Sequence, residues 1–237
     1  MTRFDILVLL FLFMVGCITG WLMELFFNRF IGKNRKWINP GFLQGPYLPI
    51  YGFGTVILYI LSYILNTFTF KNIIIDIAFI FIVASLLMTL LELVGGLFFK
   101  NVMHIKLWDY SNEKFNYKGI ICLRFSLLWG AISILYYFLI NPSLTRAVGL
   151  YTSHIEFSFI VGVFYGFILI DLFETMKVSS KIRKLAKESE LVIAFKDLKS
   201  EAEKAFDKRS FFMLPDRKDI RSYIEELKGR TRDRNDR

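Results

Sequence analysis

Five apolar segments, each long enough to cross a lipid bilayer, constrain the fold of this chain more than any other feature. They lie at about residues 5–27, 48–66, 73–99, 120–140 and 157–175. A transmembrane helix needs roughly 20 consecutive apolar residues, and a chain with 54% hydrophobic residues and 26 phenylalanines is far more apolar than a soluble domain. The sequence therefore predicts an all-α fold, a polytopic membrane helix bundle of about five transmembrane helices with a cytoplasmic amphipathic helical tail.

The positive charges of the connections predict the orientation of this bundle. Residues 28–47 and residues 100–119 each contain four Lys or Arg, whereas the connections around Lys71 and Arg146 contain one each. Because cytoplasmic connections are enriched in Lys and Arg, both basic connections are expected inside the cell and the N-terminus outside. Five spans then place the C-terminus in the cytoplasm. We therefore expect a multi-pass protein of the cell membrane.

The chain is expected to divide into a transmembrane bundle over residues 1–176 and a charged tail over residues 177–237. The tail contains 18 Lys and Arg against 12 Asp and Glu. Between residues 178 and 206 its apolar residues recur at steps of three and four, which predicts an amphipathic helix. Such a helix packs against the loops, pairs with another helix or lies on the anionic leaflet. The end of the tail is expected to be disordered.

Ionisable residues near the ends of the apolar segments predict a polar site. Each isolated charge inside hydrocarbon costs ~2.5–3.5 kcal/mol on insertion scales, so such residues usually face one another or the bundle interior. We expect one cytoplasmic cluster of Glu24, Glu92, Arg124 and Asp109, in which the two glutamates bind a substrate or ion and Arg124 is the counter-charge. A purely structural salt-bridge network is the alternative. The residues near segment ends, all on the same predicted side, are Glu24, Glu92, Arg124, Asp171 and Glu174.

The first basic connection runs into an irregular segment. Residues 39–54 contain four Gly and three Pro, which oppose a regular helix. Irregular backbone inside a membrane is tolerated only where protein or a wet cavity covers it. We therefore expect a re-entrant or tightly folded segment that contributes Gln44, Tyr47 and Tyr51 to the site. The alternative is a plain tight connection with both tyrosines as interfacial anchors.

The second basic connection places a carboxylate between two aromatic residues. Trp108 and Tyr110 are typical of the interfacial aromatic belt, and they hold Asp109 at headgroup depth. There Asp109 meets either a polar substrate or Arg124, and in the second case the pair is structural. The candidate substrate-binding residues are therefore Glu24, Gln44, Tyr47, Tyr51, Glu92, Trp108, Asp109, Tyr110, Asn116 and Arg124.

The cysteines and histidines predict no metal centre. Cys17 and Cys122 are expected at different depths, and His104 and His154 on opposite sides of the membrane, so no tetrahedral ligand set forms. We expect no metal, no cofactor and no nucleic-acid partner. No catalytic residue is assigned.

Several uncommon residues recur in an order that matches a known family. They are Trp21-Leu22-x-Glu24, Gly41-Phe42-Leu43-x-Gly45-Pro46-Tyr47-x-Pro49-Ile50-Tyr51-Gly52-Phe53-Gly54, Glu92, Trp108-Asp109-Tyr110-Ser111, Phe115-Asn116, Gly119 and Cys122-Leu123. This pattern resembles the CmpB family of type IV ABC-transporter permease-like membrane proteins, which has animal relatives named only as transmembrane proteins. The resemblance covers roughly residues 5–145. It implies a multi-pass membrane fold and a permease-like role, and it brings no substrate or catalytic residue set.

Three classes of function remain open. The first is a permease-like component for a small or amphiphilic substrate, with the Gly/Pro segment and the carboxylates at its cytoplasmic entrance. The chain has no Gly-x-x-x-x-Gly-Lys-Ser/Thr motif, so an ATPase would be a separate subunit. The second is a lipid-modifying enzyme that holds Mg²⁺ and a phosphate headgroup, and the third is a scaffold acting through its tail. The candidate partners are the lipid bilayer, an ATPase subunit and a second copy of the chain.

Overall fold

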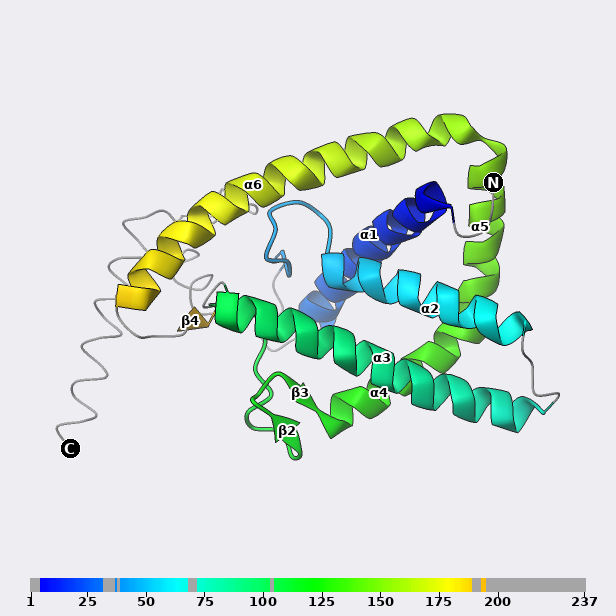
Figure 1. The fold of residues 1–237 in the computed structure, drawn as a ribbon, viewed down its shortest axis with the longest axis horizontal. Coiled ribbons are helices and arrows are strands. Elements are labelled where there is room, and N and C mark those ends of the chain that lie inside the picture. The colour runs from blue at the N-terminus through cyan, green and yellow to red at the C-terminus, as the bar shows by residue number, and fades with distance from the viewer. Residues whose placement is uncertain are drawn as a thin grey trace.

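The computed structural model of the protein describes residues 5–31, 37, 39–67, 72–102, 105–188 and 193–194. Helices dominate it (Figure 1). They are α1 (Ile6–Phe30), α2 (Pro49–Thr67), α3 (Ile73–Val102), α4 (Leu123–Leu135), the π-helical segment η1 (Tyr136–Ile140), α5 (Asn141–Ser153), the short 3₁₀ helix η2 (Ile155–Phe157) and α6 (Ser158–Glu188).

Five helical segments are long and apolar enough to cross a membrane, which confirms the predicted fold class. They are Ile6–Phe30, Pro49–Thr67, Ile73–Val102, Leu123–Ser153 and Ser158–Met176. Many large apolar side chains on these helices are exposed, including Leu86 and Leu90 of α3 and Phe167 of α6. A soluble domain would not expose so many. The bilayer is the apolar solvent that covers them.

Glycines allow the first two helices to cross closely. A Cβ atom at Gly16 would lie 2.8 Å from the Tyr51 carbonyl oxygen, and one at Gly20 would collide with the Tyr51 ring. On the facing helix, a Cβ atom at Gly52 would lie 2.5 Å from Cys17 Sγ. Small residues at such contacts are how membrane helices gain packing without a hydrophobic drive. The crossing fixes the start of α2 beside the middle of α1.

The remaining helices extend this pair. α2 packs against α3 and α3 against α4, while α6 arches along the other side of α1 (Figure 1). The main core joins α1, α2, α3 and α5 through buried residues such as Leu12, Leu58, Ala84 and Tyr151. This arrangement leaves the C-terminal half of α1, the start of α2 and the C-terminal half of α3 around one end of the bundle.

The fourth apolar segment continues as helix well beyond residue 140, where the sequence analysis had placed a connection. The π-helical segment η1 carries the chain from α4 into α5, which rises steeply at the right of Figure 1. One face of α5 is buried through Leu144, Val148 and Tyr151, and the Tyr151 ring stacks on Phe11 of α1 at 4.5 Å. Burial of this face explains why the segment is helical.

Short strands supplement the helices, and the sequence analysis did not predict them. Strand β2 (Asn116–Tyr117) pairs antiparallel with β3 (Ile121–Cys122), and β1 (Ile105–Lys106) pairs in parallel with β4 (Ile193–Ala194). The predicted helix over residues 178–206 is therefore wrong at β4, whose backbone bonds to β1 instead. Its first part continues α6 to Glu188, and residues 195–237 lie outside the described residues.

Candidate functional site

The Gly/Pro segment folds back into the bundle beside α1. The backbone N–H of Leu48 donates to the carbonyl oxygen of Cys17 at 3.0 Å, and Cys17 lies near the middle of α1. Tyr47 and Leu48 are buried, and Phe42 packs against Phe99 of α3 with ring centroids 5.0 Å apart. The segment over residues 39–48, named the re-entrant loop below, therefore agrees with the re-entrant prediction.

Asn39 organises the first part of this loop. Its Oδ1 accepts hydrogen bonds from the indole N–H of Trp21 at 2.9 Å and from the N–H of Gly41 at 3.1 Å. Its amide nitrogen donates to the carbonyl oxygens of Leu43 and Gln44 at 3.2 and 2.8 Å. The side chain thus supplies backbone partners that an irregular segment cannot supply for itself, as buried backbone polar groups require.

Asp171 of α6 holds the tip of the re-entrant loop. Its Oδ1 accepts from the N–H of Gln44 at 3.1 Å and from the Thr175 hydroxyl at 3.0 Å. Its Oδ2 accepts from the N–H of Gly45 at 2.8 Å and from the Tyr47 hydroxyl at 2.6 Å. All four donors are neutral. Asp171 therefore fastens the loop to α6. Arg124 is not among its described partners, although both residues were expected at the same end of the bundle.

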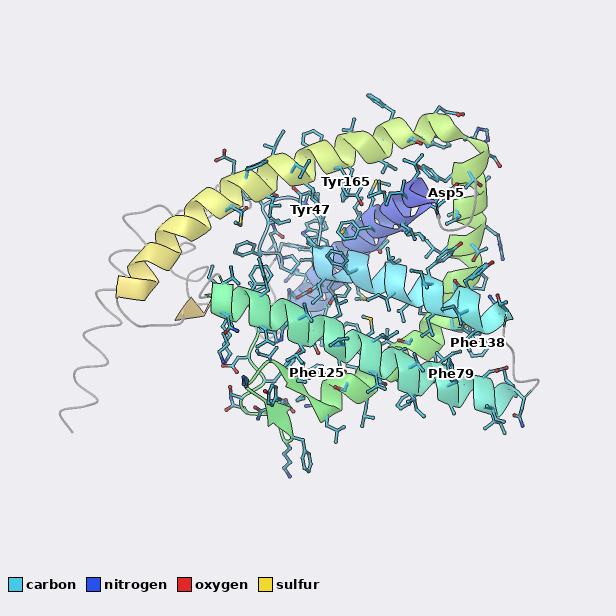
Figure 2. The ribbon with its side chains drawn as sticks, in the orientation of Figure 1. Asp5, Tyr47, Phe79, Phe125, Phe138 and Tyr165 are labelled. Atoms are coloured by element: carbon cyan, nitrogen blue, oxygen red, sulfur yellow. The ribbon has the colours of Figure 1, made fainter. Side chains whose placement is uncertain are left out.

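Figure 2 shows Tyr47 and Tyr165 together below α6. The Tyr165 hydroxyl donates to the carbonyl oxygen of Leu10 at 3.1 Å, which ties α6 directly to α1. The two tyrosines therefore connect α6 to the rest of the bundle at two levels.

A second polar group, the acid–aromatic cluster, consists of Glu24, Tyr51, Glu92, Tyr110 and Trp129. Glu92 of α3 is only 5% exposed, and the Tyr110 hydroxyl donates to its Oε1 at 2.8 Å. The Tyr51 hydroxyl hydrogen-bonds to Glu24 and interacts electrostatically with Glu92. Two predicted glutamates and two predicted tyrosines thus come together, from four different elements.

Glu92 is only half satisfied within the described residues. Its Oε2 has no hydrogen bond of good geometry there, and neither has the indole nitrogen of Trp129, although the indole lies close enough to act as a hydrogen-bond donor to this carboxylate. A buried unsatisfied polar atom costs ~1–3 kcal/mol or more if charged. Such an atom in a native fold calls for an explanation, which can be strain, a catalytic role or an ordered water or ion.

The same face of α3 carries two further unsatisfied groups. Ser85, Thr89 and Glu92 are separated by four and three residues, so they share one face of the helix. The Ser85 and Thr89 hydroxyls have no hydrogen-bond partner among the described residues. Gly130 brings α4 so close that a Cβ atom there would collide with Ser85 Oγ. A polar strip therefore leads from Glu92 along the α3/α4 interface.

Arg124 does not join the acid–aromatic cluster, so the prediction of one four-residue cluster is wrong. Its guanidinium pairs with Glu113 at 3.3 Å and remains largely exposed. Arg124 is the second residue of α4, and this position turns its side chain toward the loop surface and away from Glu92. The sequence analysis assigned Arg124 as the counter-charge of the two glutamates, but Arg124 pairs instead with Glu113 of the second basic connection.

Asp109 also lies outside the cluster. It pairs with Lys106 at 2.7 Å and accepts a hydrogen bond from the N–H of Ser111 at 2.9 Å, so neither the Asp109–Arg124 pair nor the shared cluster forms. Desolvation raises the pKa of the Asp109 carboxyl, but the bonds from Lys106 and Ser111 outweigh that effect and lower its pKa to about 2. Asp109 therefore shapes the loop as an ionised carboxylate.

Trp108 and Asn116 have structural contacts in this connection. The Trp108 indole N–H donates to the carbonyl oxygen of Ile120 at 2.8 Å. The Asn116 amide donates to the carbonyl oxygen of Glu113 at 2.8 Å and its Oδ1 accepts from the N–H of Gly119 at 3.2 Å. These bonds fold the connection over the end of α3. Tyr110 is thereby positioned over Glu92, with its ring stacked on Phe125 at 4.6 Å.

The sequence analysis did not identify Ser85, Thr89 or Trp129 as site residues. The spacing of Ser85, Thr89 and Glu92 was a signal for the first two, because hydroxyls at helical spacing with a carboxylate form one face. Among the described residues, no group of three or more His, Cys, Asp or Glu side chains is placed to hold a metal ion.

A cavity of about 450 Å³ lies between α1, the re-entrant loop and α6. It differs from the acid–aromatic cluster in both place and lining. Most of its walls are apolar, with carboxylates at one end. The lining residues used below are Ile18, Phe164, Phe167, Ile170, Asp171 and Glu174.

Comparison with known proteins gives one match. A family model described as "Putative ABC-transporter type IV", CmpB, matches residues 11–176. The matched range covers all five candidate membrane spans except residues 6–10 of the first one. No curated protein and no solved structure matches the chain.

Proposed function

Because the chain belongs to this ABC-transporter type IV family, we propose that it is the permease-like component of a membrane transport system and that its acid–aromatic cluster binds the transported substrate. The re-entrant loop forms the entrance beside this cluster. Under this proposal the protein lies in the cell membrane with the N-terminus outside, so that both basic connections and the cluster are at the cytoplasmic end.

The observation that carries the proposal is the buried, half-satisfied carboxylate of Glu92. Oε1 is used by Tyr110, while Oε2 makes no hydrogen bond of good geometry among the described residues and has the Trp129 indole beside it. A substrate that donates to Oε2 completes the hydrogen bonding of this buried carboxylate. Ionisable residues within spans commonly mark substrate or ion paths for this reason.

The energy source is proposed to be a separate ATPase subunit. The sequence has no phosphate-binding loop of the Gly-x-x-x-x-Gly-Lys-Ser/Thr type, which an ATPase of this class needs. The connection that contains β2 and β3 is exposed around Glu113 and Arg124. Its charged surface is the proposed contact for such a subunit.

Purification from native membranes tests this proposal. We expect an ATPase to co-purify with the protein and with its Glu92→Gln variant, while substrate-stimulated ATP hydrolysis at low substrate falls by about 10- to 150-fold in the variant, because a hydrogen bond to a charged group contributes ~1.5–3 kcal/mol. Glu156→Gln, a carboxylate change at the exposed His154 pair, is the matched control and should keep the stimulation. Repeated purification without an ATPase, together with lipid turnover that stops in Glu92→Gln, would favour an enzyme instead.

The proposed orientation is tested by cysteine labelling from each side. We expect Lys114→Cys to react with a membrane-impermeant thiol reagent only when the cytoplasmic face is accessible, and Lys71→Cys only from outside. The two native cysteines, Cys17 and Cys122, are buried, so they add little background. Reaction of both introduced cysteines from the same side contradicts the five-span orientation.

A further inference from the structure

The cavity beside α6 has the dimensions of a ligand site. Its volume of about 450 Å³ falls within the ~300–1,000 Å³ that is usual for ligand pockets. Its lining comes from Ile18 of α1, from the re-entrant loop with Gly45 and Pro46, and from α6. The Tyr47 ring meets Phe164 edge to face at 5.7 Å, so the deep end is aromatic.

The lining changes from apolar to acidic along α6. Phe164, Phe167 and Ile170 come first, and Asp171 and Glu174 follow on the same side. Ten residues of helix separate Phe164 from Glu174, which corresponds to about 15 Å. This is half of the ~30 Å hydrocarbon thickness. The cavity therefore matches one leaflet in depth, apolar toward the bilayer centre and charged toward the interface.

The charge at the interfacial end selects among amphiphiles. Asp171 is ionically unpaired among the described residues, because the donors on its oxygens are neutral backbone, tyrosine and threonine groups. Glu174 adds a second carboxylate one turn further along α6. A purely anionic headgroup would be repelled there, whereas an ammonium group is attracted.

We propose that this cavity binds one lipid of the cytoplasmic leaflet that carries a primary amine in its headgroup, at a site separate from the acid–aromatic cluster. The acyl chain lies along Phe164, Phe167 and Ile170, and the amine lies near Asp171 and Glu174. The assignment of the leaflet rests on the orientation given with the proposed function above. The binding site itself does not depend on a partner subunit.

Native mass spectrometry of the delipidated protein in detergent tests this site. The probes are phosphatidylethanolamine and phosphatidylglycerol with identical acyl chains. We expect phosphatidylethanolamine to bind about threefold to fivefold more tightly, the effect of a partly exposed ion pair. Glu174→Gln should reduce this preference, and Glu174→Asp should retain it.

Two tryptophan substitutions on α6 distinguish lipid binding in the cavity from lipid binding on the general lipid-facing surface. Ile170 lines the cavity and is 64% exposed, while its neighbour Leu169 does not line it and is 52% exposed. Ile170→Trp should weaken phosphatidylethanolamine binding by about tenfold or more, because the ring occupies the chain position. Leu169→Trp should not. Ile18→Trp fills the cavity from the opposite wall and should act like Ile170→Trp.

Equal binding of the two lipids, or equal binding by Ile170→Trp and Leu169→Trp, overturns the cavity proposal. This result is separate from failure of the proposed function. If an ATPase co-purifies and its stimulation falls in Glu92→Gln, but the protein shows no lipid preference, the transport proposal remains intact. If the protein prefers phosphatidylethanolamine but no ATPase co-purifies with it, the transport proposal is overturned and the lipid-site proposal stands.

Discussion

Replacement of Gly52 by valine is expected to lower the free energy of unfolding by about 3 kcal/mol, at the upper end of overpacking effects. The added Cβ atom would lie 2.5 Å from Cys17 Sγ and 2.8 Å from the carbonyl oxygen of Phe13. The second contact is with backbone, so no change of rotamer relieves it. Thermal unfolding in detergent, followed by circular dichroism, measures the loss.

The matched control for this prediction is Gly166→Val in α6. No heavy atom lies within 4 Å of a Cβ atom at that position, so the expected change is within about 0.5 kcal/mol. Equal stability of the two variants would show that α1 and α2 do not cross at these glycines. Displacement of α2 should also disturb the re-entrant loop, because the Leu48 N–H is bonded to Cys17.

The second large effect is expected at Asp171. Its replacement by alanine removes the acceptor for the N–H groups of Gln44 and Gly45 and for the hydroxyls of Tyr47 and Thr175. Hydrogen bonds to charged groups contribute ~1.5–3 kcal/mol each, without strict additivity. We expect a loss of about 3 kcal/mol in unfolding free energy and release of the loop tip.

Thiol labelling of a Gln44→Cys reporter distinguishes release of the loop from general unfolding. Labelling should accelerate in Asp171→Ala at temperatures where the helices remain intact by circular dichroism. Glu156→Gln provides the control, because Glu156 is exposed and its described partner is the exposed His154. Unchanged labelling in Asp171→Ala means that the loop is held by its buried side chains alone.

The helices were predictable because hydropathy depends on composition alone. Spans of about 20 apolar residues have few alternative structures in a bilayer, so their number and approximate bounds follow from the sequence. The re-entrant loop was predictable for a related reason, since its Gly and Pro residues exclude a helix. The helical extension through Tyr151 was not predictable, because it depends on packing against Phe11 of a distant segment.

The site was predictable only in part. Of the predicted cluster of Glu24, Glu92, Arg124 and Asp109, the two glutamates both interact with Tyr51, whereas Arg124 and Asp109 pair elsewhere. That Tyr51 lies between the two glutamates depends on the space left by Gly20, which is a tertiary contact. The pairing of Arg124 with Glu113 likewise depends on the rotation of α4 about its axis. Periodicity within a nearly uniform apolar helix does not determine that rotation.

The way the re-entrant loop is held has a consequence for gating in the proposed transport function. Near its cytoplasmic end, in the proposed orientation, the bundle is closed partly by the ten residues of the re-entrant loop. Asn39 and Asp171 hold this loop through side-chain bonds, whereas a helix is held by its own backbone ladder. Under the proposed transport function, opening a passage at this end requires a few side chains to exchange hydrogen-bond donors and leaves every helix intact. Movements of this size fit within the microsecond-to-millisecond range of functional loop motions.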